Sequence, residues 1–362
     1  MKLTKLLIIT LMLTVGVASY AQQDTVTRDP SNGDWVYTLH NPDDHNQQYV
    51  WRYTPRNQVA PKIKSAAYWN GKNFVYRYQV SNGSKAKHAM AFVWLRAPIT
   101  LKTDPTLSPV PVREAVSGAE YAFMFQGRLD SEKAFEKKTL ISPTNWYSRL
   151  NIANEDFTEF GWFPSLKDDT NDGVAVGKTV AGFAILRPEL PGVMFAKTKG
   201  ATEHPIMMGD LPKTGPIADA VKTMEDEDPV WTPVMVPSIV IPQPYNGAEL
   251  ARRIKAHANY WLKLGLITQD TLDRLNRSFD SLIAAQTYNN IAGTHAAVRE
   301  ILQEAYSHHR GLSHNKNEED DDEHDAEPVK RKAPATEALN RVAARALSFD
   351  LTYLLTRAYI GK

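Results

Sequence analysis

The stretch FVYRYQV at residues 74–80 decides the fold class of this chain. Its apolar side chains recur at every second position, which is the period of a β-strand with one buried face. Asn-Gly dipeptides at 70–71 and 82–83 flank it, and such dipeptides readily adopt the positive φ of tight turns. The next run, His88–Leu95, is almost entirely apolar. We therefore expect a second strand that is buried on both faces and pairs antiparallel with the first.

The same pattern continues on both sides of this pair. Further strands are predicted at residues 49–53, 121–125, 146–152, 179–186 and 193–196. Glycine, proline, asparagine and aspartate separate them, and no helix with a sustained 3.6-residue period can be placed before Gly247. Many short strands of this kind predict an antiparallel, two-sheet β-sandwich over residues 22–228.

Residues 229–246 are predicted to form an extended, proline-rich connector. Five prolines stand at positions 229, 233, 237, 242 and 244. Proline removes a backbone donor and breaks helices, so we expect no helix here and expect any strand to lie at a sheet edge.

The apolar period becomes helical after Gly247. A first stripe consists of Leu250, Ile254, Ala258 and Trp261. Similar stripes predict three more helices, at about 270–282, at 291–305 and from about Thr336. Closely joined helices form antiparallel neighbours, so residues 247–362 are predicted to be a helical domain. Because strands and helices are segregated along the chain, we expect an α+β protein and not a doubly wound α/β enzyme.

Residues 1–21 have the pattern of a signal peptide. Two lysines precede an apolar run over residues 6–17, and the small residues at 19 and 21 mark a cleavage site. The run of twelve residues falls short of the roughly 20 that span a bilayer, so we interpret it as cleaved and not as an anchor. We therefore expect a secreted or periplasmic protein with no membrane span after cleavage.

The composition excludes several classes of protein. The chain has 362 residues, 42 basic against 41 acidic side chains, and no cysteine. This balance provides no electrostatic basis for binding nucleic acid. The lack of cysteine excludes disulfide scaffolds, thiolate metal sites and cysteine nucleophiles. An exported protein of this composition depends on its packed core for stability, without cross-links.

Short motifs resemble a known kind of exported protein. The stretch YRYQVSNG at 76–83, followed by an apolar strand, is similar to the start of an immunoglobulin-like domain in uncharacterised exported bacterial proteins. GF at 182–183 followed by LPGV at 190–193 is similar to a later strand and turn. In those proteins the domain precedes helices that resemble FIVAR-type repeats, here ending in AAxxLxxDLxY at 343–353. The resemblance implies a binding or cell-surface role and brings no catalytic residues.

One group of residues has the ligand types of a zinc site. Four imidazoles surround the acidic run at 318–323, and imidazole with carboxylate suits zinc, copper or nickel. The alternative is a disordered, solvated loop at about 313–334, since residues 316–332 carry eight acidic and four basic side chains. The four imidazoles are those of His308, His309, His314 and His324.

A second group has oxygen donors at the spacing of calcium loops. These donors are Asp168, Asp169 and Asp172, but the EF-hand pattern requires glutamate where this chain has Thr179. An Asx-rich turn between strands explains the same residues. The sequence therefore requires no cofactor and leaves calcium and zinc as the two candidates.

Aromatic side chains provide the candidate ligand site. Seven tryptophans of the mature chain could include a platform that stacks on sugar rings, although strand aromatics are more often core. Trp94 lies in an apolar run and is expected to be buried. Trp69 and the aromatic cluster at 160–163 are the better candidates for exposure, and the candidate ligand-binding residues are Trp69, Trp146, Trp162 and Phe163.

No catalytic motif of known spacing occurs in the chain. Our first hypothesis is an exported, non-enzymatic binding or cell-envelope protein, with polysaccharide or another envelope component as its partner. The alternative is an extracellular carbohydrate-active hydrolase, which would use paired carboxylates such as Glu155-Asp156 or Asp168-Asp169. His257, on the apolar stripe of the first helix, is predicted to be a satisfied interface histidine.

Overall fold

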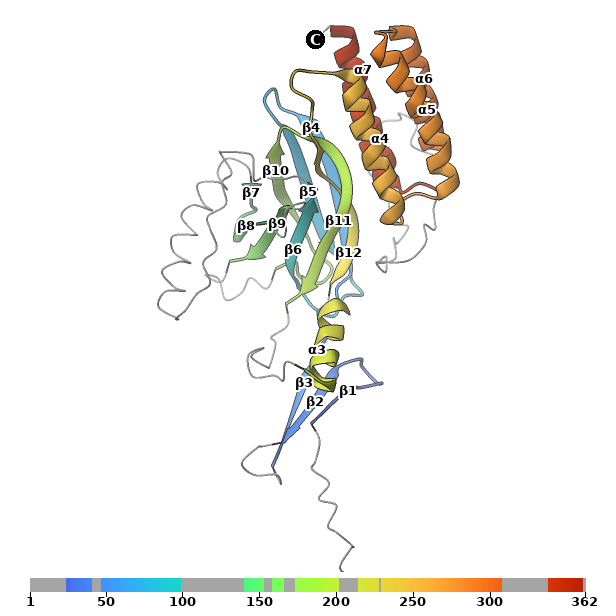
Figure 1. Cartoon of the computed structure of the whole chain (residues 1–362). Coiled ribbons are helices and arrows are strands. Elements are labelled where there is room, and N and C mark those ends of the chain that lie inside the picture. The colour runs from blue at the N-terminus through green and yellow to red at the C-terminus, as the bar shows by residue number, and fades with distance from the viewer. Residues whose placement is uncertain are drawn as a thin grey trace, which may run out of the picture. The chain divides into compact units, whose positions relative to one another are not determined.

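The protein is α+β, with most strands preceding the helices, as Figure 1 shows. Three antiparallel sheets and five helices lie in the part of the chain that the computed structural model describes. The chain divides into two compact units, one of Met1–Pro55 with Thr202–Asp228 and one of Arg56–Ala201 with Pro229–Lys362. The described residues are 24–40, 47–98, 140–152, 158–165, 173–201, 214–227, 229–307 and 338–360.

The first unit is a small sheet with one helix. Its strands are β1 (Thr25–Arg28), β2 (Trp35–His40) and β3 (Gln48–Tyr53), in the order β1-β2-β3. Helix α3 (Pro216–Glu227) contributes to the core of this unit. The buried apolar residues are Tyr37, Tyr53, Ile217, Val221 and Met224.

This unit corrects two sequence predictions. The strand predicted at 49–53 exists as part of β3, but it belongs to this separate sheet and not to the sandwich. Helix α3 was not predicted, although Pro216 suits a first helical position and three apolar residues follow at helical spacing. The sequence analysis placed these residues in the β-sandwich.

The second unit contains two sheets that pack face to face. The four-stranded sheet runs β4 (Pro61–Trp69), β5 (Phe74–Asn82), β10 (Thr179–Arg187), β7 (Leu140–Ile141). The five-stranded sheet runs β12 (Val230–Ile239), β11 (Leu190–Gly200), β6 (Met90–Ala97), β9 (Thr158–Pro164), β8 (Trp146–Ile152). Their inner faces share one core, in which the ring centroids of Tyr78 and Trp162 lie 6.0 Å apart.

Strand β5 has the predicted alternation, but its predicted pairing is wrong. Its even-numbered apolar residues are buried, whereas Arg77 and Gln79 are exposed. It pairs with β4 and β10, while β6 lies in the other sheet. Buried Asn82 stabilises the link between β5 and β6, because its side-chain amide nitrogen donates to the carbonyls of His88 and Val174 at 2.8 and 3.1 Å. A polar, Gly-bearing link therefore connects the two sheets here and does not form a hairpin.

The predicted connector is in large part a strand. Residues 230–239 form β12, and the prediction that a proline-bearing strand must lie at a sheet edge is confirmed. Pro233 and Pro237 are tolerated because β12 is the outer strand of its sheet. Sandwich and helices belong to one compact unit, which differs from the predicted boundaries at 228 and 246.

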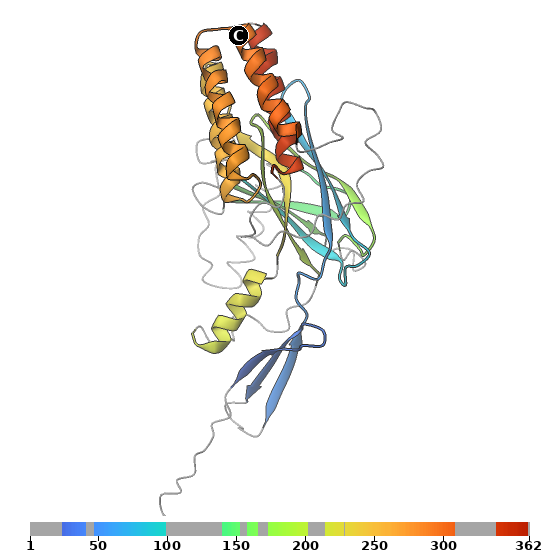
Figure 2. The same ribbon diagram turned by 90° about the vertical axis from the view of Figure 1, so that its right-hand side faces the viewer.

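Four helices follow in the same unit, and consecutive helices lie side by side in both Figure 1 and Figure 2. The predicted stripe of α4 is confirmed, with all four of its residues at most 2% exposed. The side-chain oxygen of Asn246 caps this helix by accepting from the Glu249 amide at 2.9 Å. Ile291, which was expected to face inward, is 45% exposed. The helices are α4 (Gly247–Lys263), α5 (Gln269–Thr287), α6 (Ile291–Ser307) and α7 (Arg341–Ile360).

Within the described stretches, no helix combines the length and the apolar character needed to cross a membrane.

Candidate functional site

The structure corrects the predicted aromatic platform. Trp69, at the end of β4, is 53% exposed. Trp146 and Trp162 are 9% and 0% exposed, because both point between the sheets and contact the ring of Phe183 at 5.0 and 5.6 Å. Phe163 is 7% exposed, but it lies on the opposite, outer face of β9. The expectation that Trp162 and Phe163 are exposed is therefore wrong, and the candidate ligand residue Trp146 is buried as well.

The outer face of the five-stranded sheet carries its own aromatic cluster. Phe163 packs there edge-on against Phe92 and Trp94, at 5.6 and 5.2 Å, and stacks on Tyr147 at 5.2 Å. Phe92, Trp94 and Tyr147 are only partly buried. We call this cluster, together with Trp231 of β12, the outer aromatic face.

Strand register aligns the outer aromatic face with a lysine. Lys197 of β11 stands directly between Trp94 on one side and Trp231 on the other. Its ammonium lies 5.9 Å from the centroid of the Trp231 ring. On the other side of Trp94 the sheet has Gly161, and the indole lies over this glycine, 3.2 Å from where a Cβ would be. The row therefore presents two indoles with a cation between them.

The sequence indicated these strands but not this face. Trp94 was expected to be buried because every residue around it is apolar, yet it is half-buried on the outer side of β6. In β8 and β9 two predicted ligand residues, Trp146 and Trp162, are one position away from the outward-facing Tyr147 and Phe163, of which Phe163 was itself a predicted ligand residue. A shift of one residue along a strand moves a side chain to the other face. Only the packing of the two sheets decides which side chains of β8 and β9 face the core and which face outward.

The predicted metal ligands lie outside the described residues. This holds for Asp168, Asp169 and Asp172, and for the four histidines His308, His309, His314 and His324. The paired carboxylates of the hydrolase hypothesis, at 155–156 and 168–169, lie outside them as well. Across the stretches that are described, no group of three or more His, Asp or Glu is placed to hold a metal ion.

His257 is an interface histidine, as predicted. It lies on α4, and its Nε2 accepts the amide hydrogen of Val193 in β11 at 3.0 Å. Strand β6 pairs with β11 only from Ala196 onward, so the imidazole takes the place of a strand partner for this amide. Gly192 makes the contact possible, because a Cβ there would lie 2.1 Å from Nε2. Burial lowers the pKa of His257 from 6.5 to about 4, so the ring is neutral at neutral pH and keeps its acceptor.

A buried carboxyl lies in the helix that packs against the same strands. Asp350 of α7 is 1% exposed, and its Oδ1 has no hydrogen-bond partner among the described residues. Burial raises the pKa of this carboxyl well above its usual value. Nearby, the Tyr76 hydroxyl donates to the carbonyl of Glu189 at 2.5 Å, and Arg187 pairs with the Glu189 carboxylate at 2.6 Å. Both of these contacts join residues of the sandwich to one another.

Comparisons with protein-family models, with curated proteins and with solved structures returned no match to this chain.

Proposed function

We propose that this chain is an exported, non-enzymatic binding protein of the cell envelope, whose ligand is a polysaccharide bound on the outer aromatic face. The observation that carries the proposal is the row Trp94, Lys197, Trp231 on one face of one sheet. Indole faces stack on the apolar faces of sugar rings, and a lysine between them can donate to hydroxyl or carboxylate oxygens. The cation favours an acidic polysaccharide.

The strand order supports an immunoglobulin-like sandwich as the scaffold. In immunoglobulin domains one sheet has the order A-B-E-D and the other G-F-C, which extra strands extend. Here β4, β5 and β10 occupy the positions of A, B and E, while β12, β11 and β6 occupy those of G, F and C. Strands β9 and β8 extend the second sheet. The chain departs from the pattern at β7, which precedes β8 and β9 in the sequence.

The contacts of three polar side chains, His257, Glu189 and Glu159, support a non-enzymatic role. The His257 acceptor is occupied by a backbone amide, and the Glu189 carboxylate is occupied by Arg187 at 2.6 Å. Near the aromatic face, Glu159 is likewise engaged, because Arg96 donates to it at 2.7 Å. Each of these groups is therefore engaged in a contact within the fold.

The binding proposal predicts that Trp231→Ala weakens binding of an acidic polysaccharide, such as alginate or polygalacturonate, by about tenfold or more, the range for losing one stacking aromatic. Affinity electrophoresis of the purified mature protein measures this. Trp69→Ala is the matched control, because Trp69 is exposed on the other sheet. Lys197→Met keeps the long side chain and should reduce binding of acidic glycans more than of neutral ones. Equal losses for Trp231→Ala and Trp69→Ala would refute the face as the site.

The export proposal predicts a mature chain that begins at Gln22. Expression of the full chain in a Gram-negative host, followed by fractionation and intact-mass measurement, should place this form outside the cytoplasm. Leu11→Arg interrupts the apolar run and should leave an uncleaved chain in the cytoplasm. Cytoplasmic, uncleaved wild-type protein would contradict the export proposal.

A further inference from the structure

Gly161 stands at the centre of strand β9, beneath the outer aromatic face. Glycine weakens the interior of a strand, so its presence there often marks a place where another group approaches closely. The backbone does not require a glycine here, because Gly161 is not among the seven described glycines that have a positive φ. What the position requires is space, since an added Cβ would lie 3.1 Å from the Phe163 ring and 3.2 Å from the Trp94 indole.

The contact distances show how the Trp94 indole lies on this glycine. The two indole atoms nearest to a Cβ added at Gly161 are Cδ2 and Cε2, at 3.2 and 3.3 Å. These two atoms form the bond that fuses the two rings, so another atom can come close to both only from a face of the indole. A strand Cβ points away from the plane of the sheet. The indole of Trp94 therefore lies flat over Gly161, with one face toward the sheet and the other directed away from it.

Upright rings border this flat indole. The ring of Phe163 stands at 88° to it, with the two centroids 5.2 Å apart. Tyr147 of β8 stacks on Phe163, and Phe92 of β6 meets Phe163 edge-on, so the three rings form a ridge across three neighbouring strands. The row of side chains that includes Lys197 crosses the sheet in the same direction beside this ridge. A glycan that contacts both the indole and the lysine therefore runs across the strands, along the ridge.

We propose that Gly161 is a positioning residue of the polysaccharide site, which keeps the Trp94 indole flat so that its outward face stacks on one sugar ring. This inference rests on the proposed function and deepens it. The apolar face of a pyranose ring matches the face of an indole, which a flat orientation presents fully. A side chain at position 161 would lift or tilt the indole and remove that surface, although it would leave Lys197 and Trp231 in place.

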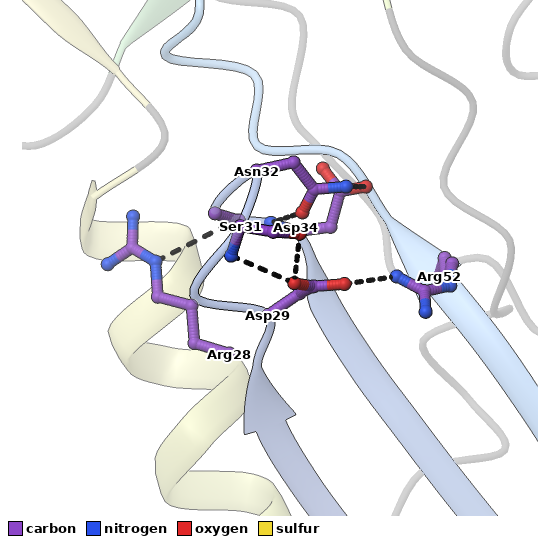
Figure 3. Close-up of polar contacts among 7 residues, drawn as sticks. Arg28, Asp29, Ser31, Asn32, Asp34 and Arg52 are labelled. Atoms are coloured by element: carbon purple, nitrogen blue, oxygen red, sulfur yellow. Dashed lines mark hydrogen bonds and ion pairs between the residues drawn. The ribbon is translucent and has the colours of Figure 1, made fainter.

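The cation of β3, in the first unit, is already paired. Arg52 donates to Oδ2 of Asp29 at 2.6 Å, and the Ser31 hydroxyl donates to Oδ1 of the same carboxylate, as Figure 3 shows. Hydrogen bonds from Ser31 and Arg52 lower the pKa of Asp29 to about 2, so this carboxylate stays charged at neutral pH. An acidic glycan therefore gains little charge attraction from Arg52. Arg52→Met removes one positive charge, as Lys197→Met does, and should leave polysaccharide binding unchanged.

The inference predicts that Gly161→Ala weakens binding of alginate or polygalacturonate at least about tenfold, the range for losing one stacking aromatic. Affinity electrophoresis of the mature protein measures the binding, and urea denaturation checks that the variant is folded. Gly83→Ala is the matched control and should bind like wild type. It also adds a Cβ at a position without a positive φ, 3.1 Å from the Cβ of Ala60, in the link that follows β5.

A double-mutant cycle separates positioning from a general structural effect. Trp94→Ala should weaken binding at least as much as Gly161→Ala, and adding Gly161→Ala to it should cost no further affinity, because no indole is left to position. Additive losses would overturn the inference. So would a Trp94→Ala variant that binds like wild type, a result that does not depend on whether Gly161→Ala folds.

Trp231→Ala distinguishes the failure of this inference from the failure of the proposed function. If Trp231→Ala weakens binding while Trp94→Ala and Gly161→Ala do not, the outer aromatic face remains the site and the role of Gly161 is wrong. If none of the three substitutions changes binding, both proposals are wrong.

Discussion

Replacing Phe74 by alanine is expected to lower the free energy of unfolding of the sandwich-helix unit by about 3–5 kcal/mol, the range for truncating a buried phenylalanine. The Phe74 ring is 1% exposed at the start of β5. It lies edge-on to Phe349 and Tyr353 of α7, with both centroids at 5.7 Å. The substitution therefore opens a cavity where the helices meet the sandwich. Urea denaturation followed by tryptophan fluorescence measures the loss.

Trp69→Ala is the matched control for this result. Trp69 contacts Phe74 at 4.9 Å from the same hairpin and is the larger side chain, but it is 53% exposed. Its removal should cost less than about 1 kcal/mol, as is usual for partly exposed positions. If Phe74→Ala costs equally little, the packing of α7 on the sandwich is not what stabilises this unit. Sandwich and helices should also unfold in one transition, whereas separate domains would give two.

The second large effect is an acid-induced loss of stability through His257. Its folded pKa of about 4 lies below the unfolded value of 6.5, so the unfolded state binds more protons between these values. Stability is therefore fully present above pH 6.5 and is lost as the pH falls toward 4. At about 1.4 kcal/mol per pKa unit, the loss is at most about 3–4 kcal/mol. Protonation also removes the acceptor that the Val193 amide uses.

Two variants separate this titration from other acid effects. His257→Gln offers a carbonyl oxygen to the Val193 amide without titrating, so its acid slope should be shallower than that of wild type. His257→Leu leaves that amide without an acceptor and should be destabilised at every pH. Asp350 acts in the opposite sense, since its raised pKa makes stability fall as the pH rises above about 3.8. Urea denaturation at a series of pH values measures the slopes, and identical slopes for wild type and His257→Gln would refute the role of His257.

Much of the local structure could be predicted because it depends on short-range periodicity. The alternation in β5, the stripe of α4 and the edge position of β12 follow directly from spacing and from proline chemistry. The α+β class follows from the same patterns. Each of these predictions uses residues within a few positions of one another.

The partners of each strand, and the face of the sheet on which each side chain lies, could not be predicted in the same way. The sequence around Asn82 does not indicate that this residue bridges two sheets, because its partners His88 and Val174 come together only in the folded chain. Most of the outer aromatic face was missed for a related reason, since Trp162 and Phe163 are equally apolar in the sequence and both were predicted to bind ligand. Which of them faces the core depends on where the second sheet packs.

The sequence by itself determined that this protein is built from short strands followed by helices, without cross-links, because propensity and apolar period are local properties. The tertiary structure alone decided that β3 belongs to a separate unit and that His257 accepts the amide hydrogen of Val193 in β11. It also decided that Trp94 and Trp231 flank Lys197. These arrangements join residues that are far apart in the chain. Their free energy comes from burial and from hydrogen bonds that exist only after the sheets and helices have packed.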